Sequence, residues 1–189
     1  MVPYCAAQCK GFSALQHGRA LSRVIFGYIT EVTTDLRPAS RITYFPMKAR
    51  IKWIENVSFV AETGSGHAVV VDGAPDAGGR NLGARPMELV LAGAAACTAF
   101  DVVWILRKAR QPITDCIVEA EAERATEEPK VFTQIHFKYR VAGHGLDPKQ
   151  VERAVKLSKE KYCSATIMLA KSAEITFEVQ VVEGNGLID

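Results

Sequence analysis

The sequence lacks an excess of charge of either sign. Its 189 residues include 23 Lys and Arg against 21 Asp and Glu, which leaves a formal net charge of +2. No run of Lys and Arg reaches five residues. Nucleic-acid binding depends on a dense basic surface that neutralises phosphates. We therefore expect no nucleic-acid partner.

Motifs that hold metals or nucleotides are also lacking. The sequence has no C-x-x-C and no H-x-x-x-H, and its four histidines stand in four separate segments, as His17, His67, His136 and His144. Zinc sites use closely spaced ligand pairs, and the C-x3-C of Cys5 and Cys9 has no second pair near it. A glycine-rich loop for phosphates is missing as well. We expect neither a metal nor a cofactor.

A disulfide framework and a clear membrane span are two further absences. Five cysteines is an odd number, which does not suit a small secreted domain with paired disulfides. This favours a reducing compartment, and we expect the cytoplasm. The longest apolar run, Leu89–Leu106, is rich in Ala and Gly and contains Asp101. It is better interpreted as a core helix than as a membrane span, so we expect no membrane partner.

The composition changes near Met47. Residues 1–46 show no sustained helical or strand period and end at a proline. A transit peptide is one interpretation, since the segment contains arginines and few acids. A poorly ordered extension, or a start codon assigned too far upstream, fits its weak amphipathicity better. We therefore predict an extension over residues 1–46 and a folded domain over residues 47–189.

From Met47 onward, the pattern predicts an α+β domain. "KARIKWIENVSFVAET" and "HAVVVDG" alternate like a pair of strands, and a long apolar helix runs from Pro86 to a stop at Gln111-Pro112. Two more alternating runs lie within residues 113–142, followed by a helix that begins at Asp147-Pro148 and breaks at Cys163. A final strand, "EITFEVQVV", gives the order β-β-α-β-β-α-β.

Two cysteines stand within apolar surroundings, and both are open to two interpretations. Cys97 lies inside "LAGAAACTAF", and Cys163 follows 66 residues later in "EKYCSATIML". An unpaired cysteine is among the most buried residue types and often acts as a small hydrophobic residue. Thiol chemistry is the alternative, since no other familiar catalytic motif is visible.

The wider runs around these cysteines resemble a known family. "RPMELVLAGAAACTAFDVVWILRKARQ" and "RAVKLSKEKYCSATIMLAKSAEI" are similar to the two signature helices of the OsmC/Ohr thiol-dependent peroxidases, and most similar to the YhfA-like branch. The resemblance extends over most of residues 47–189. It implies an intertwined homodimer around long central helices, with each active site at the subunit interface.

The resemblance also implies the chemistry. Cys97 would attack the O–O bond of an organic hydroperoxide, and Cys163 would resolve the sulfenic acid as a disulfide that an external dithiol then reduces. If a helix restarts at Cys163, its N–H groups favour a thiolate there. The alternative is a catalytically weak OsmC-like protein that binds a hydrophobic ligand or senses redox state.

The supporting charges of the family match less well. Its glutamate stands ten residues before the first cysteine, where this chain has Met87, and Glu88 stands nine before. Glu88 is still the candidate third catalytic residue. The arginine that would stabilise the Cys97 thiolate is open among Arg50, Arg80 and Arg85. We interpret Cys116, on a predicted strand, as structural.

Overall fold

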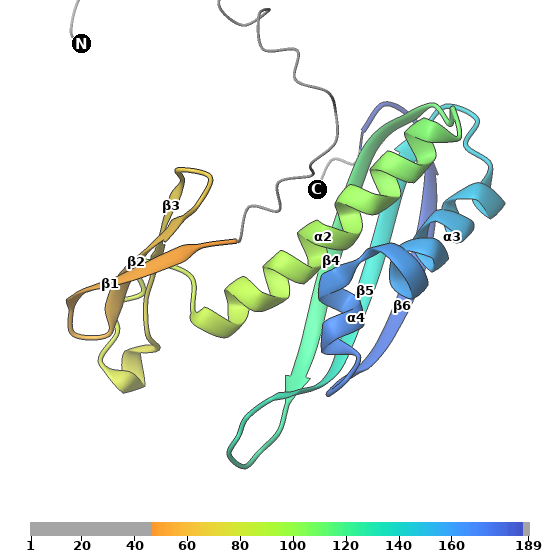
Figure 1. Ribbon diagram of the computed structural model, residues 1–189. Coiled ribbons are helices and arrows are strands. Elements are labelled where there is room, and N and C mark those ends of the chain that lie inside the picture. The colour runs from red at the N-terminus through yellow and green to blue at the C-terminus, as the bar shows by residue number, and fades with distance from the viewer. Residues whose placement is uncertain (1–46, 187–189) are drawn as a thin grey trace, which may run out of the picture. The chain divides into compact units, whose positions relative to one another are not determined.

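The structure is a computed structural model that describes residues 47–186 (Figure 1). The predicted extension over residues 1–46 lies outside the described residues, as do residues 187–189. The main elements follow the order β1-β2-β3-α2-β4-β5-α3-α4-β6, with the strands in two sheets. The predicted α+β class is confirmed.

The first sheet has three strands, where the sequence pattern predicted two. β1 (Ala49–Glu55), β2 (Ser58–Thr63) and β3 (Ala68–Val71) pair antiparallel in that order. The predicted first strand is itself a hairpin, because the chain turns at Asn56. The φ of Asn56 is 46°, in the left-handed region that asparagine tolerates better than most residues.

A buried carboxylate anchors the loop after β3. Asp72, which is 1% exposed, accepts hydrogen bonds from the N–H of Leu82 (3.0 Å) and the hydroxyl of Ser58 (2.8 Å). The N–H groups of Arg80 (3.0 Å) and Gly73 (2.9 Å) complete the set. These donors, of which the N–H of Leu82 has the largest effect, favour the charged carboxylate. They lower the pKa of Asp72 from its ordinary 3.8 to about 2.

We expect this carboxylate to make the stability of the domain sensitive to acid. Because the folded-state pKa lies below the ordinary value, the charged form stabilises the fold above about pH 4, and the contribution is lost as the pH falls toward about 2. Asp72→Asn should lower the melting temperature at pH 7 and flatten its fall in acid. Thermal unfolding from pH 2 to pH 7 measures both effects. The exposed Asp76→Asn is the control, and an unchanged acid slope in Asp72→Asn would contradict this role.

The long helix forms where the sequence predicted it. α2 spans Pro86–Lys108, and in its first turn Glu88 accepts a hydrogen bond from the N–H of Arg85 (2.9 Å). Basic residues in its last turn suit the helix dipole. Among the described residues, α2 is the one helix long and apolar enough to cross a membrane. One of its sides packs into the domain core, which favours the interpretation as a core helix.

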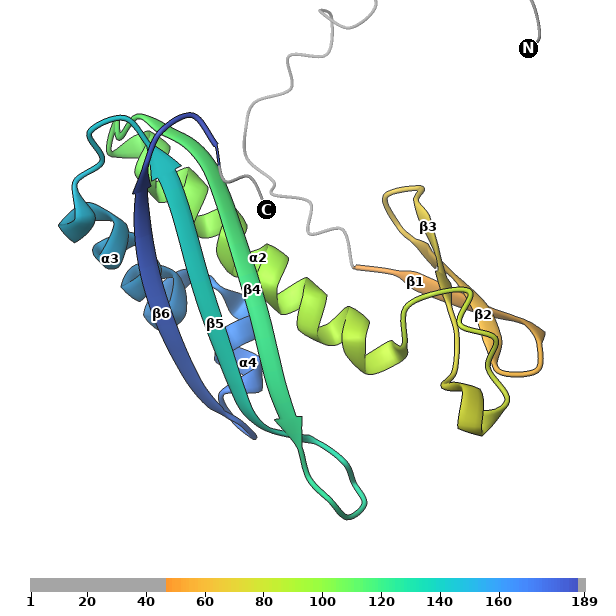
Figure 2. The same ribbon diagram turned by 180° about the vertical axis from the view of Figure 1, so that it is seen from behind.

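The second sheet supports the helices. β4 (Ile113–Arg124) and β5 (Phe132–Gly143) form the predicted hairpin, and β6 (Glu174–Glu183) pairs in parallel with β5. Its core face carries apolar side chains that alternate along β5, namely Ile135, Phe137, Tyr139 and Val141. α2 and α3 (Pro148–Leu157) cover this face (Figure 1). From behind, the strands lie in front of the helices, so within residues 47–186 the other face carries none (Figure 2).

The predicted second helix is divided into three parts. α3 begins after Asp147, whose carboxylate accepts a hydrogen bond from the N–H of Lys149 (2.9 Å). It continues into a π-helical turn, Ser158–Tyr162, and α4 (Ser164–Leu169) comes next. The predicted break at Cys163 is confirmed.

The π turn changes which side chains face the core. Val151, Val155 and Ser158 are buried, as their helical spacing predicted. Tyr162, predicted on the same stripe, is 50% exposed. The reason is that a π turn adds a residue to the helical turn and rotates the residues after it about the helix axis.

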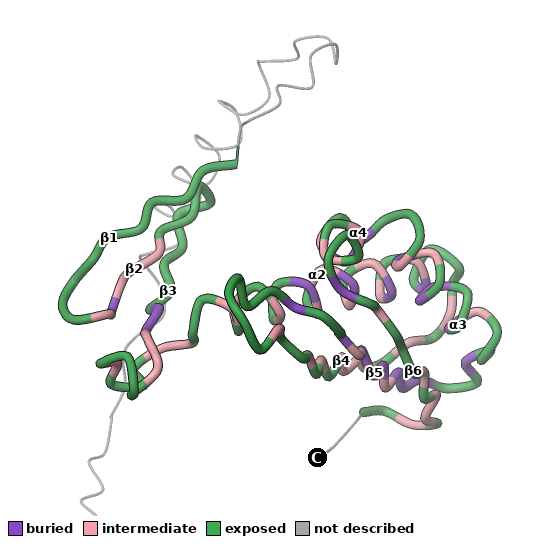
Figure 3. The backbone as a smooth tube through the Cα atoms, turned by 90° about the horizontal axis from the view of Figure 1, so that it is seen from below, coloured by how far each residue is buried: buried purple, intermediate pink, exposed green. Residues whose placement is uncertain are grey.

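α2 is less enclosed than its all-round apolar sequence predicted. Its buried residues recur every four positions, as Ala94, Thr98, Val102 and Leu106. Phe100 and Trp104, on another side, are 67% and 52% exposed. The buried segments concentrate on β5 and the helices beside it (Figure 3). One chain therefore covers one side of this helix.

Candidate active site

Cys97 lies in the middle of α2, beside the helix face that packs into the core. It is half-buried, between the buried Thr98 and the exposed Ala96. The interpretation of Leu89–Leu106 as a core helix implies a deeply placed Cys97, which is wrong for the described part of a single chain. The reason is that the side of α2 toward Ala96 and Phe100 has no cover within the described residues.

Cys163 is fully buried at the junction between the π turn and α4. Its backbone is extended, and its N–H donates to the carbonyl of Ser158 at 2.9 Å. It is the N-cap of α4, because its Sγ accepts a hydrogen bond from the N–H of Thr166 at 3.5 Å. The break in the helix thus turns a cysteine sulfur toward the first N–H groups of a new helical turn.

The structure brings Cys97 and Cys163 together. Both thiols are free, and Cys97 lies close enough to Cys163 to influence the charge of its sulfur. α2 carries the first cysteine, and the packing of α3, the π turn and α4 against α2 delivers the second. Two neighbouring thiols can be oxidised to a disulfide where their Cα atoms come within about 7 Å of each other.

The acidity of Cys163 differs from the sequence-based expectation. Burial raises the pKa of the Cys163 thiol above its ordinary value, and the neighbouring Cys97 raises it further. The hydrogen bonds with Thr166 act in the opposite direction, as expected at a helix N-terminus, but they do not outweigh burial. Cys163 is therefore a thiol at neutral pH, and it gains thiolate as the pH rises.

Glu88 lies at the start of α2 and not beside the cysteines. Its carboxylate accepts the N–H of Arg85 and lies 3.9 Å from the Arg85 guanidinium, with both side chains about half exposed. Nine residues of helix correspond to about 13 Å of rise between Glu88 and Cys97. Glu88 and Arg85 thus cap the helix in this chain.

The other two candidate arginines belong to the first sheet and the loop after it. Arg50 on β1 pairs with Glu62 on β2 at 2.6 Å. Arg80 forms an ion pair with Glu55. All four side chains are about half exposed or more. In this chain, the three arginines that the sequence offered each neutralise a surface carboxylate.

The remaining cysteines differ in their placement. Cys116 lies half-buried on β4, and burial, with the nearby charge of Asp115, raises its pKa to about 11. Such a thiol is unreactive at neutral pH, in accord with the structural interpretation. Cys5 and Cys9 lie outside the described residues. Within residues 47–186, no group of three His, Cys, Asp or Glu side chains can hold a metal.

Sequence reasoning missed a buried chain of hydroxyl groups beside the cysteines. The Oγ1 of Thr98 lies 2.7 Å from the hydroxyl of Tyr139 and 2.9 Å from that of Ser158. Ser158 in turn donates to the carboxylate of Asp101 at 3.0 Å. One signal was available, because Thr98 and Ser158 are polar residues at positions where the helical period calls for apolar ones.

An aromatic pocket opens one helical turn along α2 from Cys97. The pocket has a volume of about 440 Å³, and its walls come from α2, the end of α3 and the end of the π turn. The lining residues are Phe100, Asp101, Trp104, Ile105, Lys108, Leu157 and Tyr162. Apolar walls with a few polar groups are typical of sites for small organic ligands.

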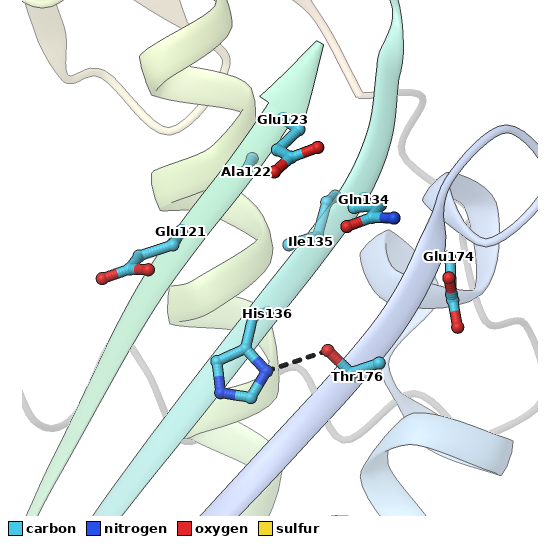
Figure 4. A pocket seen from close by; sticks show the side chains of 8 residues that line it. All are labelled: Glu121, Ala122, Glu123, Gln134, Ile135, His136, Glu174 and Thr176. Carbon is cyan, nitrogen blue, oxygen red and sulfur yellow. Dashed lines mark hydrogen bonds between the residues drawn. The ribbon is translucent and has the colours of Figure 1, made fainter.

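A second hollow, on the outer face of the second sheet, is of a different kind. It has a volume of about 240 Å³, and neighbouring strands contribute polar side chains to it, including Glu121, His136 and Thr176 (Figure 4). The imidazole of His136 lies 2.8 Å from the hydroxyl of Thr176. These side chains occupy the solvent-facing side of β4, β5 and β6, away from the face where the helices pack. We interpret this hollow as a solvated sheet surface.

Comparison with known proteins identifies the family. The family described as OsmC-like protein matches residues 78–178. Protein YhfA of Escherichia coli strain K12 is 45% identical over 139 residues, which are 72% of this chain and 98% of that protein. The crystal structure of a protein from Aquifex aeolicus VF5 is 30% identical, with a TM-score of 0.62, over 73% of this chain and 98% of the other.

A more distant solved structure shares the fold. The organic hydroperoxide resistance protein OsmC of Legionella pneumophila gives a TM-score of 0.56 at 18% identity, over 72% of this chain and 98% of that one. The family match covers more than half of the chain, and both signature cysteines lie inside it. The chain therefore belongs to the OsmC family, in the branch that contains YhfA.

Proposed function

We propose that this protein reduces organic hydroperoxides through a two-cysteine cycle. The observation that carries the proposal is the proximity of the free thiols of Cys97 and Cys163, which come from different helical segments 66 residues apart and interact electrostatically. The Legionella pneumophila relative, named for organic hydroperoxide resistance, has the same fold. Its name supports the choice of substrate class.

The cycle uses each sulfur once. The Cys97 thiolate attacks one oxygen of the peroxide, the O–O bond breaks, and the alkoxide leaves as an alcohol after gaining a proton. Cys97 is then a sulfenic acid. The Cys163 sulfur displaces its hydroxyl as water and closes the disulfide, which protects Cys97 from further oxidation. An external dithiol supplies the two electrons that restore both thiols.

The half-buried position of Cys97 suits the attacking role, because a peroxide has to reach that sulfur. The full burial of Cys163 suits the resolving role, because in that role it reacts with another sulfur of the same site. The aromatic pocket next to Asp101 provides apolar surface for the organic part of a substrate. Free thiols also suit a reducing compartment, which is consistent with a cytoplasmic location.

The proposal includes a homodimer with its active sites at the interface. In one chain, Phe100 and Trp104 form a stacked aromatic pair, with ring centroids 6.2 Å apart, that is largely exposed. Exposed apolar side chains of this kind support the proposal of an interface. A second chain would cover it and supply charges to Cys97 that residues 47–186 of its own chain do not place there.

A weakly catalytic relative remains the second candidate function. Three observations favour it: Glu88 caps α2, the candidate arginines pair with other carboxylates, and burial raises the pKa of Cys163. Such a protein would bind a hydrophobic ligand in the aromatic pocket or respond slowly to oxidants.

Turnover separates the two functions. With a dithiol such as dihydrolipoamide, we expect the full-length protein to consume cumene hydroperoxide faster than hydrogen peroxide, because the apolar pocket favours the organic substrate. A monothiol should support less turnover, since reduction of an enclosed disulfide favours a second thiol on the same reductant. Consumption in the presence of Cys97→Ser is the background rate. Equal background and wild-type rates for both peroxides would favour the binding protein.

A further inference from the structure

The buried hydroxyl chain joins the two halves of the thiol site at defined points. Thr98 directly follows Cys97 on α2, and its hydroxyl contacts that of Ser158 at 2.9 Å. The carbonyl of the same Ser158 accepts the N–H of Cys163 at 2.9 Å. Ser158 therefore links the neighbour of one cysteine to the backbone of the other.

The Asp101 carboxylate at one end of this series of hydroxyl groups determines which group donates in each hydrogen bond. Ser158 has one hydroxyl proton and donates it to Asp101. Thr98 must then donate to Ser158, and Tyr139 must donate to Thr98, because each hydroxyl has a single proton. The arrangement has one consistent set of donors and acceptors, and it ends at the half-buried carboxylate of Asp101.

Such a chain defines distances more strictly than apolar packing does. Thr98 and Ser158 are fully buried and Tyr139 is 2% exposed, so a hydroxyl that lost its partner would stay unsatisfied. Separation of α2 from the π turn weakens two buried hydrogen bonds at once, those of Ser158 with Thr98 and with Asp101. A disulfide also requires narrow geometry between its two Cα atoms.

The π turn ties the position of Cys163 to the same chain. Its five residues, Ser158–Tyr162, end in the hydrogen bond from the Cys163 N–H to the Ser158 carbonyl. π turns inside helices occur frequently at functional sites. Here the π turn places Cys163 in a fully buried position near Cys97. Its first residue, Ser158, is hydrogen-bonded to Thr98 on α2.

We propose that Asp101, Ser158, Thr98 and Tyr139 are positioning residues that hold Cys97 and Cys163 at disulfide-forming separation, with Ser158 as the central link. This inference rests on the proposed thiol cycle. It concerns the geometry of the pair, however, and can be measured without peroxide.

The test is the equilibrium between the two thiols and glutathione. Oxidised glutathione accepts two electrons and two protons from Cys97 and Cys163 and leaves as two reduced molecules. The squared concentration of reduced glutathione divided by that of oxidised glutathione, at half-oxidation of the protein, therefore gives the effective concentration of one thiol for the other. Full-length wild type, Ser158→Ala, Thr98→Val and Thr98→Ser are compared. Mass mapping of alkylated peptides identifies the disulfide.

We expect Ser158→Ala and Thr98→Val to lower the effective concentration about tenfold, because each removes a buried hydrogen bond between the segments. Thr98→Ser keeps the hydroxyl and should stay within about twofold of wild type. Val155→Ala on α3 is the matched control, since it truncates a buried apolar side chain in the same core and leaves the hydroxyls in place. Melting temperatures of all variants show that they fold.

Three outcomes would overturn the inference: an unchanged effective concentration in Ser158→Ala and Thr98→Val, an equal loss in Val155→Ala, or no Cys97–Cys163 disulfide in the wild type. The last outcome would also remove the proposed function. A wild type that forms the disulfide but consumes no peroxide would remove the proposed function alone, and the positioning role would stand if the variants behave as expected.

Discussion

One equivalent of cumene hydroperoxide should remove two thiols per chain and lower the mass by about two hydrogens, as expected when a sulfenic acid condenses with a second thiol. Peptide mapping should find the new disulfide between Cys97 and Cys163, because these free thiols are close enough to interact electrostatically. Cys116 should stay reduced, since burial holds its pKa at about 11 and keeps it protonated.

Single substitutions should separate the two roles with large effects. Cys97→Ser should reduce peroxide consumption to the background rate, because it removes the attacking sulfur. Cys163→Ser should allow one turnover and then accumulate Cys97 as sulfinic or sulfonic acid, which mass spectrometry detects as added oxygen. Cys116→Ser serves as the control and should keep wild-type turnover. Oxidation confined to Cys5 and Cys9, with Cys97 untouched, would contradict the cycle.

The elements of the domain follow from local signals in the sequence. Asp147-Pro148 predicts the start of α3 because a short acidic side chain caps the first N–H groups, and the structure has this hydrogen bond. The alternating runs of β4 and β5 predict a hairpin with one apolar face. The extra strand of the first sheet escaped prediction because Asn56 turns the chain inside a run whose alternation continues on both sides.

The site itself depends on tertiary contacts that local patterns do not carry. The hydroxyl of Thr98 meets Tyr139 and Ser158 at sequence separations of 41 and 60 residues. The pKa of Cys163 is set first by burial and only second by its local helix N-terminus, so the local pattern predicted the wrong direction. The pairing of Cys97 with Cys163 came from family resemblance, and the packing of α4 against α2 supplies its physical basis.

The composition of α2 and its burial do not match within the described residues. A helix that is apolar on all sides is normally surrounded by protein. α2 is buried on one side in the chain, through Ala94, Thr98, Val102 and Leu106. On another side, Phe100 and Trp104 stay open to solvent. The sequence of α2 therefore suits more contacts than one chain makes.

We expect a second copy of the chain to make those contacts, so that light scattering at micromolar concentration gives about twice the chain mass of 20.6 kDa. Trp104→Glu places a charge in the apolar surface that dimerisation would desolvate, and should raise the dimer dissociation constant at least about 100-fold. Gln180→Glu adds the same charge to β6, opposite Arg140 on the neighbouring strand, and should stay dimeric.

A monomeric wild type would exclude the interface. A Trp104→Glu dimer of unchanged strength would move the interface to another surface of the domain.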